Sequence, residues 1–196
     1  MGYKIAITGG IGSGKSTVCD IIKEQGYQVF SCDAIYKDLL YEPSYVKQIE
    51  AAFPNVVENN CINLKKLSSI VFDNTAALKR LNAIAHPAIM QTLLKQMNAT
   101  TDKFVFAEVP LLFEGKFEGL FDKIIVVERD RNERISSVIK RSNLTQDEVL
   151  DRMQMQFPYD TQAAKAHFAK VNAIIIQNIG DFNQLKENVL AALMLL

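Results

Sequence analysis

The sequence predicts an α/β domain built around a five-stranded parallel sheet. An apolar run at 3–8 precedes a glycine-rich segment and a helix-like segment that begins near residue 18. Two later runs, 103–109 and 123–128, are apolar on both faces, which is typical of central strands in a parallel sheet. Shorter strands are expected at 27–32 and 172–177. Segments with helical periodicity separate the strands, so helices are expected on both faces of the sheet.

The glycine-rich segment after the first expected strand reads Gly9-Gly10-Ile11-Gly12-Ser13-Gly14-Lys15-Ser16-Thr17. It fits the pattern G-x-x-x-x-G-K-[ST] of phosphate-binding loops, in the strand–loop–helix context that the pattern requires. Glycines let backbone N–H groups approach phosphate oxygens, and the helix dipole acts at the same place. Lys15 is expected to reach the β- and γ-phosphates of a nucleotide and Ser16 to ligate Mg²⁺, with Thr17 beside it. The alternative is a glycine-rich turn that binds no ligand.

Length, charge and cysteine content limit the remaining possibilities. The 196 residues suit one compact domain or one core with small insertions, and 48% apolar residues exclude a disordered chain. A formal net charge of zero gives no overall attraction to nucleic acid or to an anionic membrane. Cys19, Cys32 and Cys61 fit no metal-ligand spacing and are expected to be reduced thiols in a cytosolic protein. We recognise no signal peptide and no apolar run long enough to span a bilayer.

Two candidate residues lie in and before a long helical stretch. Asp33 directly follows the second expected strand, at the sheet edge where open α/β proteins bind ligands. It is a candidate catalytic carboxylate, a candidate N-cap of a helix over 34–40, or both. From 42 to 98 the apolar spacing predicts three helices, the last extendable to residue 97, and no convincing strand. His86, followed by Pro87, lies in this stretch, and a lone histidine is more often a packed or surface residue.

The second half of the chain adds a carboxylate and a group of arginines. Glu108 ends the third expected strand, where it either orients Mg²⁺-bound water or a substrate hydroxyl, or is a solvated loop acid. Between 129 and 152 lie five of the six arginines, which are Arg129, Arg131, Arg134, Arg141 and Arg152. Arginine suits bidentate contact with phosphoryl oxygens, and kinases cover the transferred phosphate with a mobile segment. The alternative is a pair of solvated helix faces.

Two helix starts in this half are marked by capping residues. Thr145 and Glu148 form a capping box that predicts a helix ending near residue 156, with Leu144 and Val149 as its hydrophobic staple. Asp181 and Gln184 are expected to cap a closing helix. Its core-facing stripe is expected to consist of Phe182, Leu185, Val189 and Leu193.

Taken together, these residues resemble the dephospho-CoA kinase family. The resemblance rests on the loop, Asp33, His86-Pro87, the run Val109-Pro110-Leu111-Leu112-Phe113-Glu114, and the segment that holds Arg141, Arg152 and Gln156. It implies a three-layer P-loop kinase fold with a helical substrate-binding insertion at 42–98 and a helical lid at 130–168. It further implies ATP- and Mg²⁺-dependent phosphorylation of the ribose 3′-hydroxyl of dephospho-CoA, the last step of CoA synthesis. Apart from the resemblance, we expect a cytoplasmic protein that is a monomer or weak homo-oligomer.

The resemblance also implies a role for each matching residue. Asp33 would accept the proton of the substrate hydroxyl and would carry catalysis together with Lys15 and Arg141. Arg141 would contact the ATP phosphates, and Asn178 would lie near the adenine. The other substrate contacts are expected from His86, Glu108, Pro110, Leu111 and Arg152.

Three positions depart from the family pattern, and two other functions stay open. The family commonly has acids where Ser31, Ala173 and Gln177 stand in this chain. These departures leave substrate affinity and adenine contacts in question. The alternatives are another P-loop kinase acting on nucleosides or nucleotides, and a nucleotide-dependent switch that hydrolyses slowly and phosphorylates no small molecule.

Overall fold

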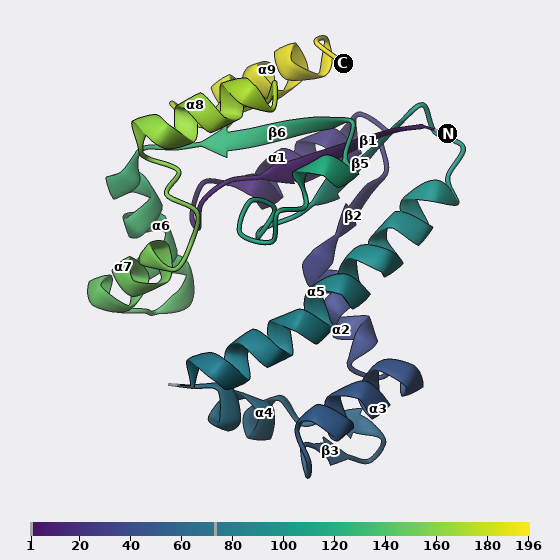
Figure 1. The fold of residues 1–196 in the computed structure, drawn as a ribbon. Coiled ribbons are helices and arrows are strands. Elements are labelled where there is room, and N and C mark those ends of the chain that lie inside the picture. The colour runs from purple at the N-terminus through teal and green to yellow at the C-terminus, as the bar shows by residue number, and fades with distance from the viewer. Residues whose placement is uncertain (1, 73) are drawn as a thin grey trace. The chain divides into compact units, whose positions relative to one another are not determined.

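A computed structural model of the chain describes residues 2–72 and 74–196, and it divides into two compact units. The first unit holds the chain up to Phe30 together with Thr100–Leu196. The second unit is Ser31–Ala99. Figure 1 labels the helices and strands of both units, which we describe one at a time.

The first unit is built on a five-stranded sheet with the strand order β2-β5-β1-β6-β7. Its strands are β1 (Tyr3–Thr8), β2 (Val29–Ser31), β5 (Phe104–Glu108), β6 (Lys123–Glu128) and β7 (Ile174–Gln177). β1 lies parallel to both neighbours and pairs Ile7 with Glu108 of β5 and with Ile125 of β6. This register brings the carboxyl ends of the three strands to one edge. The predicted sheet is confirmed, although β2 is shorter than expected because Cys32 already begins a helix.

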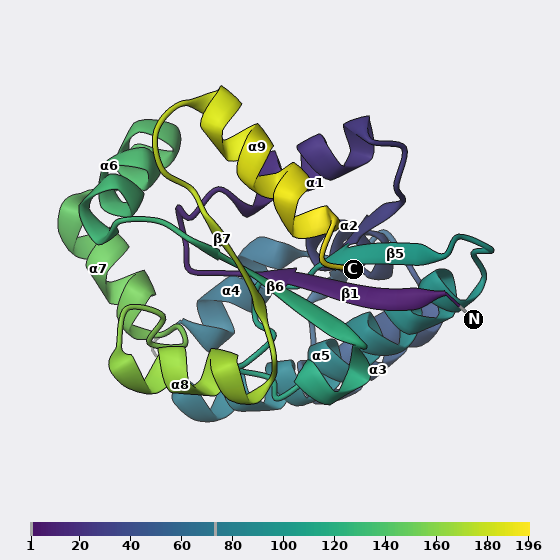
Figure 2. The ribbon, with the colours of Figure 1, turned by 90° about the horizontal axis from the view of Figure 1, so that it is seen from above.

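Helices cover both faces of this sheet and make the three predicted layers. α1 (Lys15–Glu24) and α9 (Phe182–Leu193) share one core with the sheet. α8 (Gln162–Lys170) lies on the other face (Figure 2), where the ring of Phe168 stacks on that of Phe113 at 5.6 Å between centroids. The expected stripe of α9 was wrong at one position, because Phe182 at the helix start is 52% exposed.

The segment after β6 forms two helices beyond the carboxyl ends of the strands (Figure 1). α6 (Arg131–Ser142) ends at Asn143, whose φ of 51° is left-handed, and α7 (Gln146–Gln154) follows. The capping box is confirmed, since the Glu148 N–H donates to Thr145 Oγ1 at 3.3 Å and the Thr145 N–H to Glu148 Oε2 at 2.8 Å. α7 ends two residues before the predicted end. A short 3₁₀ turn, η1 (Glu118–Leu120), precedes β6.

The second unit is mainly helical. Its helices are α2 (Cys32–Leu39), α3 (Pro43–Ala52), α4 (Leu64–Val71) and α5 (Thr75–Asn98). The third predicted helix and its extension are therefore one 24-residue helix. Sequence reasoning missed a small antiparallel hairpin of β3 (Val57–Glu58) and β4 (Cys61–Ile62). Across the described parts of both units, no helix is long and apolar enough to cross a bilayer.

Candidate active site

The glycine loop takes a conformation that only small residues allow. Gly12 and Gly14 have φ angles of 77° and 96°, in the left-handed region that favours glycine. A Cβ atom at Gly10 would lie 2.6 Å from Nη2 of Arg134, and one at Gly12 would lie 2.6 Å from the Arg134 carbonyl oxygen. The loop is therefore both left-handed and tightly packed, and its glycines satisfy both demands.

The Lys15 ammonium and the N-terminal end of α1 make the junction of loop and helix electropositive. Lys15 Nζ donates to the carbonyl oxygens of Gly9 at 2.8 Å and Gly10 at 3.2 Å, so its ammonium group lies against the loop. Gly14 is the N-cap of α1, and no described side chain caps the first-turn N–H groups. The first turn also lacks an acidic residue that would offset the positive end of the helix dipole. This end of α1 is suited to bind an anion.

Two oxygen ligands lie side by side at the start of α1. The Ser16 hydroxyl donates to Glu108 Oε1 at 3.2 Å, because the register of β1 and β5 places the end of β5 beside the loop. Residues 2–72 and 74–196 contain no group of three or more His, Cys, Asp or Glu that could hold a metal. Mg²⁺ commonly uses one or two protein oxygens and completes its shell with water and substrate phosphates. The Ser16–Glu108 pair fits an ion of that kind.

Asn178 joins the end of β7 to the loop. Its side-chain Nδ2 donates to the Ser13 carbonyl at 2.8 Å, and its backbone N–H donates to the Glu128 carbonyl at 2.8 Å. Ser13 is buried, and its hydroxyl oxygen has no hydrogen-bond partner among the described residues. The predicted contact between Asn178 and adenine stays a prediction.

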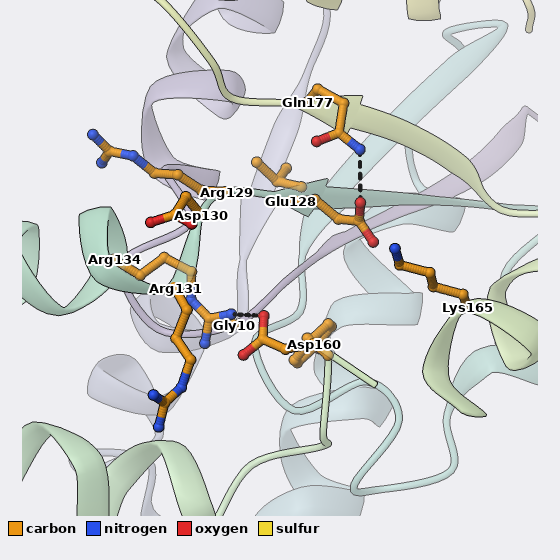
Figure 3. Close-up of a pocket in the computed structure, with 11 residues that line it drawn as sticks. Gly10, Glu128, Arg129, Asp130, Arg131, Arg134, Asp160, Lys165 and Gln177 are labelled. Atoms are coloured by element: carbon orange, nitrogen blue, oxygen red, sulfur yellow. Dashed lines mark hydrogen bonds and ion pairs between the residues drawn. The ribbon is translucent and has the colours of Figure 1, made fainter. Parts of the chain in front are cut away.

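A pocket of about 300 Å³ opens beside Gly10, at the carboxyl ends of β6 and β7 (Figure 3). Its charged lining combines four cations and three acids, which are Arg129, Arg131, Arg134, Lys165, Glu128, Asp130 and Asp160. Gln177 Nε2 donates to Glu128 Oε2 at 2.7 Å, and the Lys165 side chain extends toward the same carboxylate. The pocket wall is thus polar, and it contains the hydrogen-bonded pairs Gln177–Glu128 and Arg134–Asp160.

Arg134 differs from the other arginines of this segment because it is only 4% exposed. Its Nε donates to the Ile11 carbonyl at 3.1 Å, and its Nη1 bonds Asp160 Oδ1 at 2.8 Å. Burial lowers the pKa of its guanidinium, and the carboxylate of Asp160 opposes that shift. Sequence reasoning grouped Arg134 with the lid arginines and missed this role. Its spacing of four residues from the apolar Val138, which puts both on one helix face, was an available signal.

The remaining arginines are on the surface. Arg129 Nε bonds Glu133 Oε2 at 3.0 Å, and Arg131 is exposed, which agrees with the solvated-face interpretation for these two. Arg141 lies in the last turn of α6 and Arg152 in the last turn of α7, and both are exposed. Their roles toward phosphate and substrate stay predictions.

Asp33 and His86 both belong to the second unit. Asp33 is exposed in the first turn of α2, but the N-cap is Ser31, whose Oγ accepts from the Ala34 N–H at 3.4 Å. The expectation that Asp33 caps this helix was therefore wrong. Ser31, one of the departures from the family pattern, has a structural task instead. His86 is half-buried in α5 immediately before Pro87.

The turn after β5 holds the last two predicted substrate residues. Pro110 is half-buried, whereas Leu111 is exposed. The same turn contains Glu114, whose Oε1 accepts from the Phe157 N–H at 2.8 Å. This stretch therefore contacts the segment that follows α7, and the substrate contacts of Pro110 and Leu111 stay predictions.

A family model described as dephospho-CoA kinase matches residues 3–181. This chain belongs to the dephospho-CoA kinase family. A dephospho-CoA kinase of Carboxydothermus hydrogenoformans is 33% identical over 195 residues, which cover 96% of this chain and 92% of that protein. One from Bacillus licheniformis is 36% identical over 168 residues and covers 83% of this chain and 84% of its own.

Solved structures share the fold of this chain. The crystal structure of TT1252 from Thermus thermophilus matches with a TM-score of 0.83 at 30% identity, covering 99% of this chain and 97% of that one. A dephospho-CoA kinase from Campylobacter jejuni matches at 0.65 with 24% identity, covering 98% and 96%. A shikimate kinase from Bacteroides thetaiotaomicron matches at 0.54 with 13% identity, covering 98% and 97%. The last two likenesses concern the fold alone.

Proposed function

We propose that this member of the dephospho-CoA kinase family transfers the γ-phosphoryl group of ATP to the ribose 3′-hydroxyl of dephospho-CoA. The products are CoA and ADP, so the reaction completes CoA synthesis. The observation that carries the proposal is the glycine loop, where left-handed glycines, an uncapped helix start, the Lys15 ammonium and the Ser16 hydroxyl come together. The family membership then selects the acceptor.

The residues of the loop would hold and neutralise the triphosphate. Backbone N–H groups at the start of α1 would bind phosphate oxygens, and Lys15 would move from the Gly9 and Gly10 carbonyls to the β- and γ-phosphates. Ser16 and Glu108 would hold Mg²⁺, directly or through water. A metal held there would supply positive charge that neutralises the phosphate oxygens. Positioning and charge neutralisation supply most of the rate in phosphoryl transfer.

The acceptor side of the proposal rests on the helical unit. Asp33 would orient the 3′-hydroxyl and take its proton. Its exposure and its position just after β2 support this role, as does the fact that Ser31 already performs the capping. His86 and the helices around it would bind the rest of dephospho-CoA. Arg141 and Arg152, which are exposed on α6 and α7, would reach the phosphates when this segment covers the site.

We also infer a cytoplasmic location. Cys19, Cys32 and Cys61 form no disulfide, as is usual for proteins of a reducing compartment. That the protein is a monomer or weak homo-oligomer remains a prediction, which gel filtration with light scattering would test.

Mass-spectrometric detection of CoA from dephospho-CoA, ATP and Mg²⁺ tests the function directly. We expect the Asp33→Asn variant to bind ATP normally and to form CoA far more slowly. Asp20→Asn is the matched control, because Asp20 is an exposed aspartate of α1 that pairs with Lys23. Phosphorylation of nucleosides or nucleotides instead of dephospho-CoA would favour a different kinase. ATP binding without a phosphorylated product would favour the nucleotide-dependent switch.

A further inference from the structure

Ile11, in the middle of the glycine loop, is held at both of its backbone polar groups by side chains from distant parts of the sequence. Its N–H donates to Gln156 Oε1 at 2.7 Å, and its carbonyl accepts from Arg134 Nε at 3.1 Å. The backbone on either side of Ile11 is glycine, which has little conformational preference of its own. These two side-chain bonds therefore constrain the part of the loop that its own sequence leaves loose.

Arg134 is held in turn by Asp160. A guanidinium that is 4% exposed needs partners for its charge, and Asp160 supplies the carboxylate at 2.8 Å from Nη1. Figure 3 shows this pair at Gly10, where the guanidinium occupies the space that a side chain at that position would need. Removing the carboxylate would leave a buried cation that competes for other acceptors, and the loop carbonyl would lose a fixed donor.

The segment that carries Asp160 is itself fixed to the sheet. It connects α7 to α8 and also contains Gln156 and Tyr159. The hydroxyls of Tyr159 and Thr8 lie 3.0 Å apart, and Thr8 is the last residue of β1 before the loop. The Phe157 N–H donates to Glu114 at 2.8 Å. The connection therefore forms a rigid support beside the loop, and Arg134 links the two.

We propose that Arg134 and Asp160 form a positioning pair, which acts through Ile11 to keep the glycine loop in its phosphate-binding conformation. Neither residue need touch the nucleotide. The pair would set the affinity for ATP and the geometry of phosphoryl transfer, while leaving the binding of dephospho-CoA unchanged. The kinetic part of this proposal rests on the proposed function.

A double-mutant cycle tests the pair, using Arg134→Gln, Asp160→Asn and the double variant. Each single variant should raise KM and Kd for ATP by roughly ten- to a hundredfold, since misplacement of about 1 Å has effects of that size. KM for dephospho-CoA should stay within about twofold. The double variant should be no worse than either single one, because the two residues act as a unit.

An exposed ion pair between α1 and α9 provides the control. Lys186→Gln and Glu24→Gln remove a surface pair at 3.0 Å between Nζ and Oε2, and neither residue lines the pocket beside Gly10. Exposed pairs of this kind contribute little, so ATP binding should be unchanged in these variants. Asp160→Glu, which keeps the carboxylate at a half-exposed position, should recover most of the ATP affinity.

Hydrogen exchange of residues 9–14 distinguishes a loss of loop positioning from a loss of overall stability. It also does so without any assay of kinase activity. In Asp160→Asn the loop should exchange faster while the peptides of β1 and α9 keep their wild-type protection. Unchanged ATP binding and unchanged loop exchange in a folded Asp160→Asn would overturn the proposal. So would a parallel loss of affinity for both substrates together with a lower Tm. If the wild type made no CoA, the proposed function would fail, but ATP Kd and loop exchange would still decide the role of the pair.

Discussion

The Ser16 hydroxyl and the Glu108 carboxylate, 92 residues apart in the chain, lie within hydrogen-bond distance at 3.2 Å. The first belongs to the turn of α1 that follows the loop and the second to the end of β5. The pairing of β1 with β5 brings them together. The pair brings together two oxygen atoms of the kind that Mg²⁺ prefers in proteins.

Glu108→Gln should weaken the use of Mg²⁺ without changing the fold. The amide oxygen can still accept from Ser16, but the negative charge that attracts the metal is lost. We expect the Mg²⁺ concentration for half-maximal activity to rise by about ten- to a hundredfold. Titration of CoA formation with Mg²⁺ at saturating ATP measures this. Glu128→Gln is the control, because Glu128 ends the neighbouring strand β6, and an equal shift there would contradict a metal role for Glu108.

Arg141→Ala should lower kcat by roughly 10³-fold, the smaller end of what an arginine on the transferred phosphate contributes. Arg141 is exposed, so its removal leaves no cavity, and the Tm should stay within about 2 °C of wild type. Single-turnover phosphoryl transfer by rapid quench measures the chemical step. Lys140→Ala removes the adjacent cation of α6 and should retain normal turnover. Near-normal kcat in Arg141→Ala would exclude this arginine from the mechanism.

Cys19 should be inert toward thiol reagents in the folded protein. Burial raises the pKa of its thiol to about 12, and the charge of Glu108 acts in the same direction. At pH 8 only about one thiol in 10⁴ is then a reactive thiolate, and the side chain is also shielded. Cys61 is half-buried in the small hairpin and should react first. Reaction with a chromogenic disulfide measures this, and its fast phase should be absent in Cys61→Ser. A fast phase assigned to Cys19 would contradict the burial of that thiol.

Glu148→Gln should destabilise α7 at neutral pH and have less effect in acid. Hydrogen bonds from the Thr145 N–H and hydroxyl hold the pKa of Glu148 below its ordinary value. The charged carboxylate is therefore favoured by the folded state, so its contribution is complete above the unfolded pKa. That contribution is lost as the pH falls through the lowered pKa.

Local opening of α7, measured by hydrogen exchange and corrected for intrinsic rates, would test this pH dependence. The protection of α7 in the variant should approach that of wild type as the pH is lowered. Glu133→Gln, which removes an exposed carboxylate of α6 outside any capping box, is the control. An effect of Glu148→Gln that stayed constant across the pH range would contradict the charge argument.

Much of this architecture could be predicted because the secondary structure that short sequence patterns favour is also the one that packs in the folded chain. The bounds of β1 and β6, the capping box of α7 and the glycine loop all follow from patterns within ten residues or fewer. The small hairpin escaped notice because its strands are too short to alternate, and its turn is made by Asn59 and Asn60 in left-handed conformations. α8 was missed as a separate element because it was included in a broad lid region without a marked helix start.

The support of the loop could not be predicted, because its residues are distant in sequence and carry no motif. In a segment rich in arginines, sequence alone does not distinguish the buried Arg134 from the surface arginines. Its burial is known only once the residues that pack around it are known. Asp160 and Tyr159 likewise belong to a connection whose composition suggests only a turn. Their roles depend on which helix face packs against Gly10 and Gly12, and that is a property of the folded unit.

Pro87 interrupts the longest helix of the protein near its middle, one residue after His86. Proline has no N–H. The carbonyl of Ala83, four residues earlier, therefore lacks the backbone hydrogen bond that any other residue at position 87 would donate. α5 is therefore expected to bend most easily within one turn of His86, where its backbone lacks a hydrogen bond.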